Sequence, residues 1–147
     1  MIKIGVLGCA DIAKRLIIPN MIKSGLYEIV AVASRSKEKA QEFAGLFNCE
    51  PIIGYENLLS RKDIEAIYVP LPTGMHYEWI IKGLNAGKHI FAEKSLANEY
   101  TEVKAIVDLA IQKNLCVFEN FMFVFHSQFD AVKSVIADYF NKNDNGE

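Results

Sequence analysis

Short apolar runs alternate along this chain with longer segments of helical periodicity. The apolar runs predict strands at Ile2–Leu7, Tyr27–Ala33, Glu50–Ile53, Ala66–Val69, His89–Ala92 and Leu115–Glu119. The segments between and after them predict helices at Asp11–Lys23, Ser36–Phe47, Glu56–Ser60, Gly74–Asn85, Ala97–Lys113 and Gln128–Tyr139, followed by a polar tail. Apolar strands separated by helices are typical of a parallel sheet covered on both faces. The sequence therefore predicts an α/β fold, a doubly wound parallel sheet of about six strands with helices on both faces.

Three residues are expected to shape the ends of these helices. Ser36 is a plausible N-cap, because its hydroxyl oxygen can accept a hydrogen bond from a backbone amide of the first turn. Gly87 follows a predicted helix and suits the left-handed conformation that often ends one. Pro19 lies inside the first predicted helix and lacks a backbone donor, so we expect it to kink that helix or end it early.

Composition excludes several classes of protein. The 147 residues suffice for one domain with a hydrophobic core, and a net charge of -2 gives no electrostatic reason to expect nucleic acid as a partner. No apolar stretch approaches the ~20 residues of a membrane span, and the start lacks the apolar region of a signal peptide. We therefore expect a cytoplasmic protein with no membrane partner. Cys9, Cys49 and Cys116 form no metal or redox pattern, which favours buried thiols in a reducing compartment and no metal site.

The first predicted strand runs directly into the stretch Gly8-Cys9-Ala10-Asp11-Ile12-Ala13. A dinucleotide-binding fingerprint requires Gly-x-Gly-x-x-Gly/Ala at this place, and the stretch fits if Ala10 replaces the second glycine. The helix that follows would offer free N–H groups to a phosphate. The Asp11 carboxylate would repel that phosphate, and its alternative role is to cap the helix. On this stretch alone, a phosphate cradle and a plain turn are equally supported.

The second predicted strand ends in Ala33-Ser34-Arg35-Ser36, about 20 residues after the glycine loop. In dinucleotide-binding folds, the residue that hydrogen-bonds the adenosine ribose lies at this position. An acidic residue there would select NAD. Arg35 instead can form a forked hydrogen bond to a 2′-phosphate and stack on adenine, with Ser34, Ser36 and Lys39 beside it. This composition favours NADP as the cofactor, with NAD as the second choice. The alternative is a solvated turn with ordinary surface charge.

Two later stretches carry a resemblance to a known family. They are Tyr68-Val69-Pro70-Leu71-Pro72-Thr73-Gly74-Met75-His76-Tyr77-Glu78-Trp79 and Ala86-Gly87-Lys88-His89-Ile90-Phe91-Ala92-Glu93-Lys94-Ser95-Leu96-Ala97. Together with the glycine loop and the Arg35 segment, they resemble the Gfo/Idh/MocA oxidoreductases, which include glucose–fructose oxidoreductase, inositol dehydrogenase and many sugar and nucleotide-sugar dehydrogenases. The stretch Glu119-Asn120-Phe121-Met122-Phe123-Val124-Phe125-His126 is similar to the family's segment that leaves the sixth strand.

The resemblance implies a Rossmann-type dinucleotide-binding domain over residues 1–126, with a terminal helix and tail over residues 127–147. The cofactor-binding residues that it implies are Gly8, Cys9, Ala10, Asp11, Ile12, Ser34, Arg35, Ser36, Lys39, Leu71, Pro72, Thr73, His76, Glu93, Lys94 and Asn120. The glycine loop would hold the pyrophosphate and the Arg35 segment the adenosine end. Leu71, Pro72, Thr73 and His76 would line the cofactor cleft after the fourth strand.

Glu93 and Lys94 match the family's Glu-Lys-Pro motif, whose lysine reaches both the nicotinamide ribose and the substrate hydroxyl. The resemblance thus implies Lys94 as the catalytic residue, because an ammonium group near a substrate oxygen stabilises charge and relays a proton. Ser95 stands where the family has proline. The family's peptide bond before this proline is often cis, and a cis bond before another residue costs several kcal/mol. We therefore expect the loop around Lys94 to adopt a conformation different from that in the family.

Family members continue into a second, α+β domain that closes the substrate pocket, and this domain is absent from these 147 residues. The resemblance implies hydride transfer between nicotinamide and a sugar or nucleotide-sugar hydroxyl or ketone, which the isolated chain is not expected to catalyse. Two alternatives remain, namely a non-catalytic dinucleotide-binding or sensing module and a truncated remnant with a structural or partner role. The apolar run Phe121–Phe125 is expected to drive self-association, with a homodimer as the first expectation.

Overall fold

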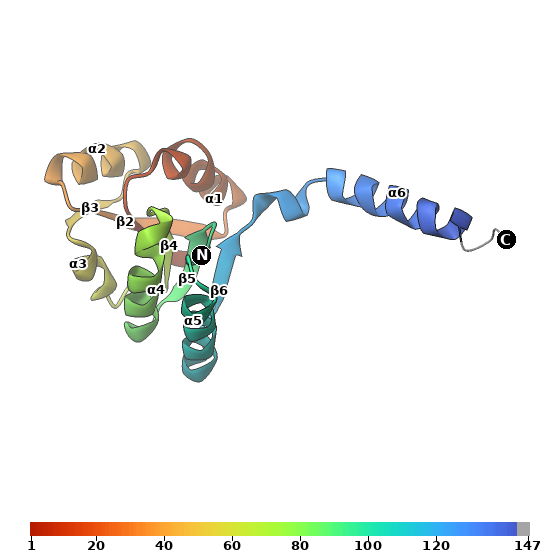
Figure 1. Ribbon diagram of the computed structural model, residues 1–147. Helices are drawn as coiled ribbons and strands as arrows, with labels where there is room; N and C mark the ends of the chain where they lie inside the picture. The colour runs from red at the N-terminus through yellow and green to blue at the C-terminus, as the bar shows by residue number, and fades with distance from the viewer. Residues whose placement is uncertain (144–147) are drawn as a thin grey trace.

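The computed structural model describes residues 1–143, so the end of the expected polar tail lies outside the described residues. The strands are β1 (Ile2–Leu7), β2 (Tyr27–Ser34), β3 (Glu50–Ile53), β4 (Ala66–Val69), β5 (His89–Glu93) and β6 (Val117–Asn120). The helices are η1 (Ala13–Ile17), α1 (Ile18–Ser24), α2 (Lys37–Phe47), α3 (Tyr55–Leu59), η2 (Thr73–Met75), α4 (His76–Asn85), α5 (Tyr100–Lys113), η3 (Met122–Phe125) and α6 (Gln128–Asn143). All strand pairs are parallel in the order β3-β2-β1-β4-β5-β6 (Figure 1), which confirms the doubly wound, Rossmann-type prediction.

Two hydrophobic layers lie on opposite faces of the sheet. Successive side chains of a strand point to opposite faces, so Ile4 and Val6 of β1 belong to one layer and Leu7 to the other. The first layer packs β1 and β2 against α1 and α2, and the second packs the sheet against α3, α4 and α5. Helices therefore cover both faces of the sheet, as the apolar character of the strands indicates.

The first helix does not end at Pro19, which corrects one of the two outcomes expected there, a kink or an early end. Its opening turns form the π-helix η1, in which the Ile18 N–H donates to Ala13 O five residues back. Pro19 then lies in the first turn of α1, where a missing N–H is tolerated. The helix continues to Ser24 and closes at Gly25, which has a φ of 69°.

Two predicted boundaries differ from the observed ones because local hydrogen bonds compete with the regular element. Helix α5 begins at Tyr100 rather than Ala97, since the Asn98 N–H donates to a Glu102 carboxylate oxygen (3.2 Å) and holds the approach to the helix as a loop.

Strand β6 begins at Val117 rather than Leu115, because the Leu115 N–H donates to Ala110 O (2.9 Å) and closes α5. Other local predictions are confirmed: Ser36 caps α2 by accepting from the Lys39 N–H (3.3 Å), and Gly87 has a φ of 76°.

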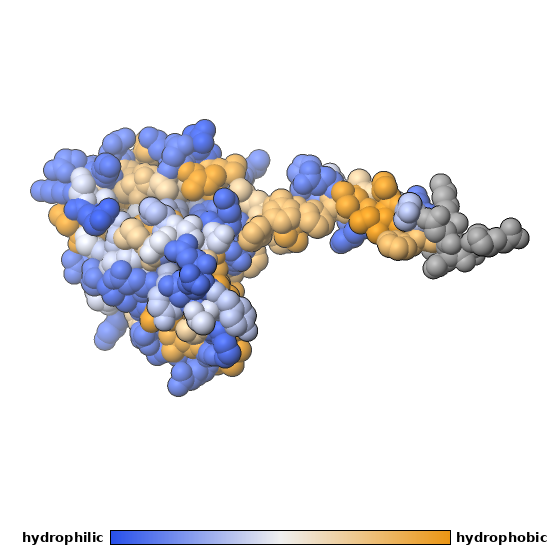
Figure 2. Space-filling view, in the orientation of Figure 1, coloured by the Kyte–Doolittle hydropathy of each residue, from blue (hydrophilic) through white to orange (hydrophobic). Residues whose placement is uncertain are grey.

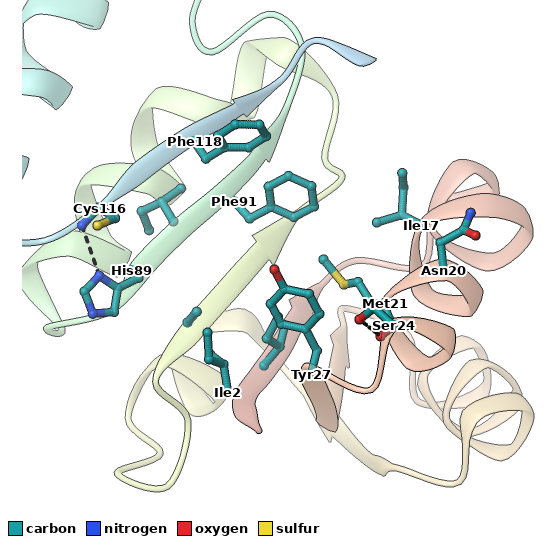
Figure 3. Close-up of a pocket in the computed structure, with 13 residues that line it drawn as sticks. Ile2, Ile17, Asn20, Met21, Ser24, Tyr27, His89, Phe91, Cys116 and Phe118 are labelled. Carbon is teal, nitrogen blue, oxygen red and sulfur yellow. Dashed lines mark hydrogen bonds between the residues drawn. The ribbon is translucent and has the colours of Figure 1, made fainter. Parts of the chain in front are cut away.

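One part of the sheet is not covered by any helix of residues 1–143. On the α1 side of β4, β5 and β6, the rings of Tyr68, Phe91 and Phe118 stack in succession with centroids 5.1 and 5.4 Å apart. An apolar groove of about 620 Å³ runs between these strands and α1, and Phe91, Phe118 and Met21 point into it (Figure 3). Helix α6 does not cover this groove, since it extends away from the sheet and exposes much apolar surface (Figures 1 and 2).

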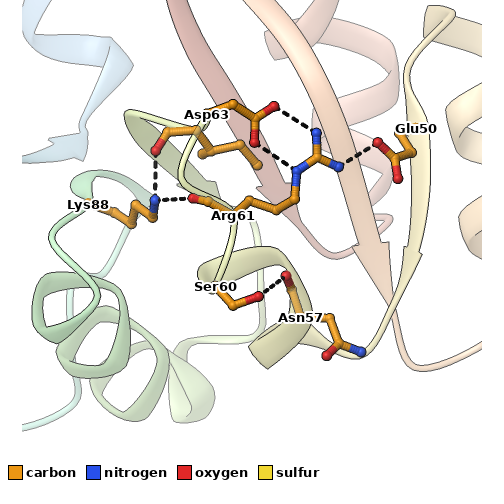
Figure 4. A network of polar contacts seen from close by, with 7 residues as sticks. Glu50, Asn57, Ser60, Arg61, Asp63 and Lys88 are labelled. Atoms are coloured by element: carbon orange, nitrogen blue, oxygen red, sulfur yellow. Dashed lines mark hydrogen bonds and ion pairs between the residues drawn. The ribbon is translucent and has the colours of Figure 1, made fainter.

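A polar network joins the loops at the amino-terminal edge of the sheet (Figure 4). The Arg61 guanidinium donates to both carboxylate oxygens of Asp63 (2.8 and 2.7 Å) and also pairs with Glu50. The hydrogen bonds from Arg61 lower the pKa of Asp63 to about 2. Lys88 is buried and donates to Ile64 O (2.7 Å) and to Arg61 O, and its burial lowers its pKa. This network fixes the loops opposite the edge where the strands end.

Candidate functional site

A cleft of about 600 Å³ opens at the carboxyl ends of β1, β2 and β4. Its lining residues are Gly8, Cys9, Ala10, Ser34, Arg35, Ser36, Lys39, Tyr55, Pro70, Leu71 and Pro72. The strand order reverses between β1 and β4, and ligands of open α/β sheets bind at such a switch point. The cleft thus brings together the glycine loop, the Arg35 segment and the loop after β4, which lie far apart in the sequence.

The backbone of the glycine loop requires a residue without a side chain at Gly8. Its φ is +112°, a conformation that L-residues rarely adopt, and a Cβ there would lie 2.9 Å from Leu71 Cδ2. The Gly8 N–H donates to Ala33 O (2.9 Å), which ties the loop to the end of β2. The loop is therefore a tight turn that exposes backbone to the cleft, as a phosphate-binding turn does.

One wall of the cleft, the Arg35 wall, is formed by Ser34, Arg35, Ser36 and Lys39. Ser34 is buried and its Oγ accepts from the Ser36 N–H (3.2 Å), which shapes the turn between β2 and α2. Ser36 donates to Glu38 (2.7 Å), and the backbone hydrogen bond of Glu38, followed by this bond from Ser36, lowers the pKa of that carboxyl. Arg35 and Lys39 are exposed, and within residues 1–140 no carboxylate forms a salt bridge with either of them. Two unpaired cations thus face the cleft from this wall.

Asp11 does not cap the helix, which corrects one of its two expected roles. No side-chain hydrogen bond caps η1, and the Asp11 carboxylate instead pairs with Arg15 Nε one turn later (2.6 Å). Both side chains are exposed, so a long, flexible arginine reaches the carboxylate more readily than the rigid backbone amides do. Asp11, Ile12 and Thr73 lie in the predicted segments but do not line the cleft.

A second group of predicted residues gathers where β5 and β6 end. Glu93 Oε1 accepts hydrogen bonds from the Asn120 amide (2.8 Å) and from the buried Tyr68 hydroxyl (2.7 Å). Burial, and then the bond to Glu93, raises the pKa of Tyr68, which keeps its phenol protonated as a donor. Lys94 follows this anchored carboxylate directly and is exposed. The cluster therefore fixes the backbone just before Lys94 while its ammonium group stays accessible.

The loop after Lys94 departs from the sequence-based expectation. The Lys94–Ser95 peptide bond is cis, so serine in place of proline does not give this bond the trans form. Neighbouring groups are held by hydrogen bonds: Ser95 O contacts His76 Nδ1 (2.7 Å), and the Leu96 N–H donates to a Glu119 carboxylate oxygen (2.8 Å).

His76 does not line the cleft, contrary to the expectation for this residue. Its ring is fully buried, at 0% exposure, and lies between the loop after β4 and the loop after β5. The ring nitrogens contact Leu71 O and Ser95 O (2.7 Å each), so the side chain is held between these two loops rather than in the cleft.

The cysteines differ in burial. The Cys9 thiol contacts Lys39 O (3.6 Å), and burial raises its pKa, so the cleft wall carries a neutral thiol. Cys49 is partly buried, and burial raises its pKa to about 11. Cys116 is exposed, which corrects the expectation of three buried thiols, because it lies in the surface loop that leads into β6.

Two cleft residues escaped the sequence reasoning. Tyr55 opens α3 and Pro70 follows β4, and both line the cleft. The available sequence signal for Tyr55 was a hydroxyl-bearing aromatic residue directly after Gly54 and directly before a predicted helix. Within residues 1–143, no group of three or more His, Cys, Asp or Glu is placed to hold a metal ion. No helix over the same residues combines the length and apolar character that crossing a bilayer requires.

A doubly wound parallel sheet with a glycine turn and an arginine-lined cleft at its switch point defines the Rossmann class of nucleotide-binding domains. Residues 2–121 match the family model described as "Oxidoreductase family, NAD-binding Rossmann fold". The chain belongs to this family, the Gfo/Idh/MocA oxidoreductases, which confirms the resemblance found in its sequence.

The relatives include several sugar reductases. A dTDP-3,4-didehydro-2,6-dideoxy-alpha-D-glucose 3-reductase of Saccharopolyspora spinosa is 48% identical over 92% of this chain and 41% of its own length. The crystal structure of KijD10, a 3-ketoreductase from Actinomadura kijaniata in complex with TDP-benzene and NADP, superposes with a TM-score of 0.89 at 42% identity, over 93% of this chain and 43% of that one. An oxidoreductase from Thermotoga maritima gives a TM-score of 0.85 at 29% identity over the same shares of the two chains. The chain thus spans about two fifths of the length of these relatives.

Proposed function

We propose that this chain is the NADP(H)-binding domain of a reductase that acts on the carbonyl group of a nucleotide-linked sugar. The observation that carries the proposal is the shared cleft of the Gly8 turn and the Arg35 wall. The Gly8 turn exposes its backbone to the cleft, where a pyrophosphate can contact it, and the cations of Arg35 and Lys39 suit the 2′-phosphate of NADP. Among the residues that the structure describes, no acidic side chain lines the cleft to select the 2′-hydroxyl of NAD.

The relatives support the choice of cofactor and substrate class. KijD10 is a 3-ketoreductase with NADP and a TDP compound bound, and the Saccharopolyspora spinosa relative is named for reduction at C3 of a dTDP-linked keto sugar. By extension, the protein to which this domain belongs would reduce a keto group of a dTDP-linked sugar. NADPH supplies the hydride in such a reduction.

The residues of this chain have distinct roles in that proposal. Gly8, Cys9 and Ala10 hold the pyrophosphate, the Arg35 wall holds the adenosine end, and Leu71 and Pro72 border the cofactor along the loop after β4. Lys94 lies next to the reacting carbonyl oxygen, stabilises the charge that develops on it and donates the proton that completes the alcohol. The bonds that Glu93 accepts from Tyr68 and Asn120 hold the backbone of Lys94 in place.

A second candidate function is dinucleotide binding without turnover by the 147-residue chain. The exposure of Lys94 favours it, because hydride transfer requires a site shielded from water and a substrate positioned over the nicotinamide. We expect NADPH oxidation by this chain in the presence of a dTDP-linked 3-keto sugar to stay at background. Turnover above background would remove this candidate and leave the reductase proposal.

Calorimetric titration of the chain with NADPH and then NADH tests the proposed cofactor. We expect NADPH to bind at least about tenfold more tightly, which corresponds to about 1.4 kcal/mol. Equal affinities for NADPH and NADH would show that the Arg35 wall does not bind the 2′-phosphate. Failure of both cofactors to bind would overturn the proposed function of this chain.

A further inference from the structure

The side chain of Tyr55 is almost wholly buried, but its hydroxyl has no partner in the described part of the chain. The residue is 6% exposed and lines the cleft. No group of residues 1–140 forms a hydrogen bond with the hydroxyl. Within the same residues, the buried side-chain polar atom that lacks a partner is Trp79 Nε1, so the Tyr55 hydroxyl is itself reached by solvent from the cleft. A buried ring thus presents an unpaired donor to the cleft.

Packing and a backbone hydrogen bond fix the direction of this hydroxyl. The Tyr55 ring meets the Trp79 ring edge to face, with centroids 4.9 Å apart. The Gly54 N–H donates to Ser34 O (2.9 Å), which ties the start of α3 to the end of β2. A donor that is held in place before a ligand arrives loses little conformational freedom on binding.

The hydroxyl lies beside the glycine turn. A Cβ on Gly8 would be 3.9 Å from Tyr55 Oη, so the hydroxyl and the backbone of the turn border the same part of the cleft. In the proposed function, this turn holds the diphosphate of the cofactor. Each oxygen of an ionised diphosphate accepts hydrogen bonds, and a hydroxyl donor at this place supplements the backbone N–H groups of the turn.

The other polar side chains of the cleft are already bonded or lie on the opposite wall. The Cys9 thiol contacts Lys39 O (3.6 Å). Arg35 and Lys39 belong to the Arg35 wall, which the proposed function assigns to the 2′-phosphate. Among the lining residues that the structure describes, Tyr55 is therefore the unpaired side-chain donor outside that wall.

We propose that Tyr55 is a cofactor-binding residue whose hydroxyl donates a hydrogen bond to the diphosphate of the nicotinamide cofactor. This inference rests on the proposed function, because that function places the diphosphate on the Gly8 turn. NADPH and NADH share the diphosphate, so Tyr55 contributes affinity for both cofactors and does not discriminate between them. Selection of NADPH belongs to the Arg35 wall.

Calorimetric titration of Tyr55→Phe tests the proposal. Phenylalanine keeps the ring but removes the hydroxyl, so we expect the affinities for NADPH and NADH to fall by the same factor, about tenfold. Adenosine 2′-monophosphate carries no diphosphate, and its affinity should stay within about twofold of the wild-type value. Tyr27→Phe is the matched control, because Tyr27 is partly buried and lines the apolar groove; its cofactor affinities should also stay within about twofold.

Urea unfolding of Tyr55→Phe separates a binding role from a structural one. Because the hydroxyl has no partner within residues 1–140, the variant should unfold at the wild-type urea midpoint. A lower midpoint would show that the hydroxyl stabilises the fold and would overturn the proposal.

The titrations distinguish failure of this inference from failure of the proposed function. Wild-type affinity of the folded Tyr55→Phe chain for both cofactors would overturn the role of Tyr55 and leave the proposed function standing. An equal loss of affinity for adenosine 2′-monophosphate would overturn the assignment of the hydroxyl to the diphosphate. Absence of binding of either cofactor to the wild-type chain would overturn the proposed function, and this inference with it.

Discussion

The Tyr68 hydroxyl donates a hydrogen bond to Glu93 Oε1 over 2.7 Å, which links β4 to the residue before Lys94. The phenol is fully buried and its ring stacks on Phe91, so the donor has little freedom to turn elsewhere. Asn120 donates to the same oxygen from β6. Three neighbouring strands thus converge on one carboxylate, and the position of Lys94 depends on buried groups rather than on a loose surface loop.

Replacement of Tyr68 by phenylalanine removes one of these donors. We expect Tyr68→Phe to lower the free energy of unfolding by about 1–2 kcal/mol, because Glu93 loses a buried partner while the ring packing is kept. Urea unfolding measures the change. Tyr27→Phe is the control: Tyr27 is partly buried in the apolar groove, and its loss of a hydroxyl should stay within about 0.5 kcal/mol. Equal effects of the two variants would contradict a special role for the Tyr68–Glu93 bond.

The Arg35 side chain should decide between the two nicotinamide cofactors. Loss of a charged hydrogen bond to the 2′-phosphate should make Arg35→Ala bind NADPH more weakly by roughly 1.5–3 kcal/mol, with a smaller loss for NADH. Lys37→Ala removes a cation from the same turn that does not line the cleft, and it should change both affinities little. Calorimetry of both variants with both cofactors measures the effect. An equal loss for NADPH and NADH would refute the 2′-phosphate assignment.

Gly8 should tolerate no side chain. Gly8→Ala forces a Cβ into a φ of +112° and to 2.9 Å from Leu71 Cδ2, so we expect a loss of about 1–3 kcal/mol in unfolding free energy and loss of NADPH binding. Gly45→Ala is the control, because Gly45 lies in α2 with open space around its Cα; it should stabilise the chain by about 0.5–1 kcal/mol. Thermal unfolding and NADPH titration compare the two. A Gly8→Ala chain of wild-type stability would show that the turn is not as constrained as its backbone indicates.

The Arg61–Asp63 pair should stabilise the fold only above strongly acidic pH. The pKa of Asp63 is lowered in the folded chain from 3.8 to about 2, so its contribution is complete above the higher value and is lost as the pH falls through the lower one. Arg61→Gln should therefore destabilise the chain near neutral pH and lose this effect toward about pH 2. Lys104→Gln breaks an exposed pair with Asp108 on one helix face and should have a smaller effect at neutral pH. Urea unfolding at a series of pH values gives the comparison, and a pH-independent effect of Arg61→Gln would contradict the assignment.

The apolar segment after β6 should cause self-association. Phe121, Met122, Phe123, Val124 and Phe125 are all exposed, and Val132, Val135, Ile136, Tyr139 and Phe140 extend the apolar surface along α6 (Figure 2). We expect light scattering to detect a dimer or larger species, and Phe125→Asp to shift it toward monomer. Tyr100→Asp is the matched control, since Tyr100 is 79% exposed against 78% for Phe125 but lies outside this segment. A wild-type chain that stays monomeric at high concentration would contradict the prediction.

Local patterns were sufficient for most of the fold. The strand β4 has the predicted bounds Ala66–Val69, and the cap at Ser36 and the left-handed Gly87 lie where short-range rules place them. These features depend on a few neighbouring residues, so local reasoning reaches them. The start of α5 and the course of the helix through Pro19 were missed, because each depends on a competing hydrogen bond or on a change of helical register.

The candidate site divides in the same way. The sequence by itself determined the parallel sheet, the glycine turn and the arginine directly after β2. Each depends on a short segment: the apolar pattern of the strands, the glycine that a positive φ requires, and the spacing between the glycine loop and the arginine. Only the tertiary structure decided that Tyr68 and Asn120 meet on Glu93, that Tyr55 enters the cleft, and that His76 is a buried bridge rather than a cleft residue. Those relationships depend on contacts between segments distant along the chain, and the direction of a side chain in such contacts is set by packing that no local pattern contains.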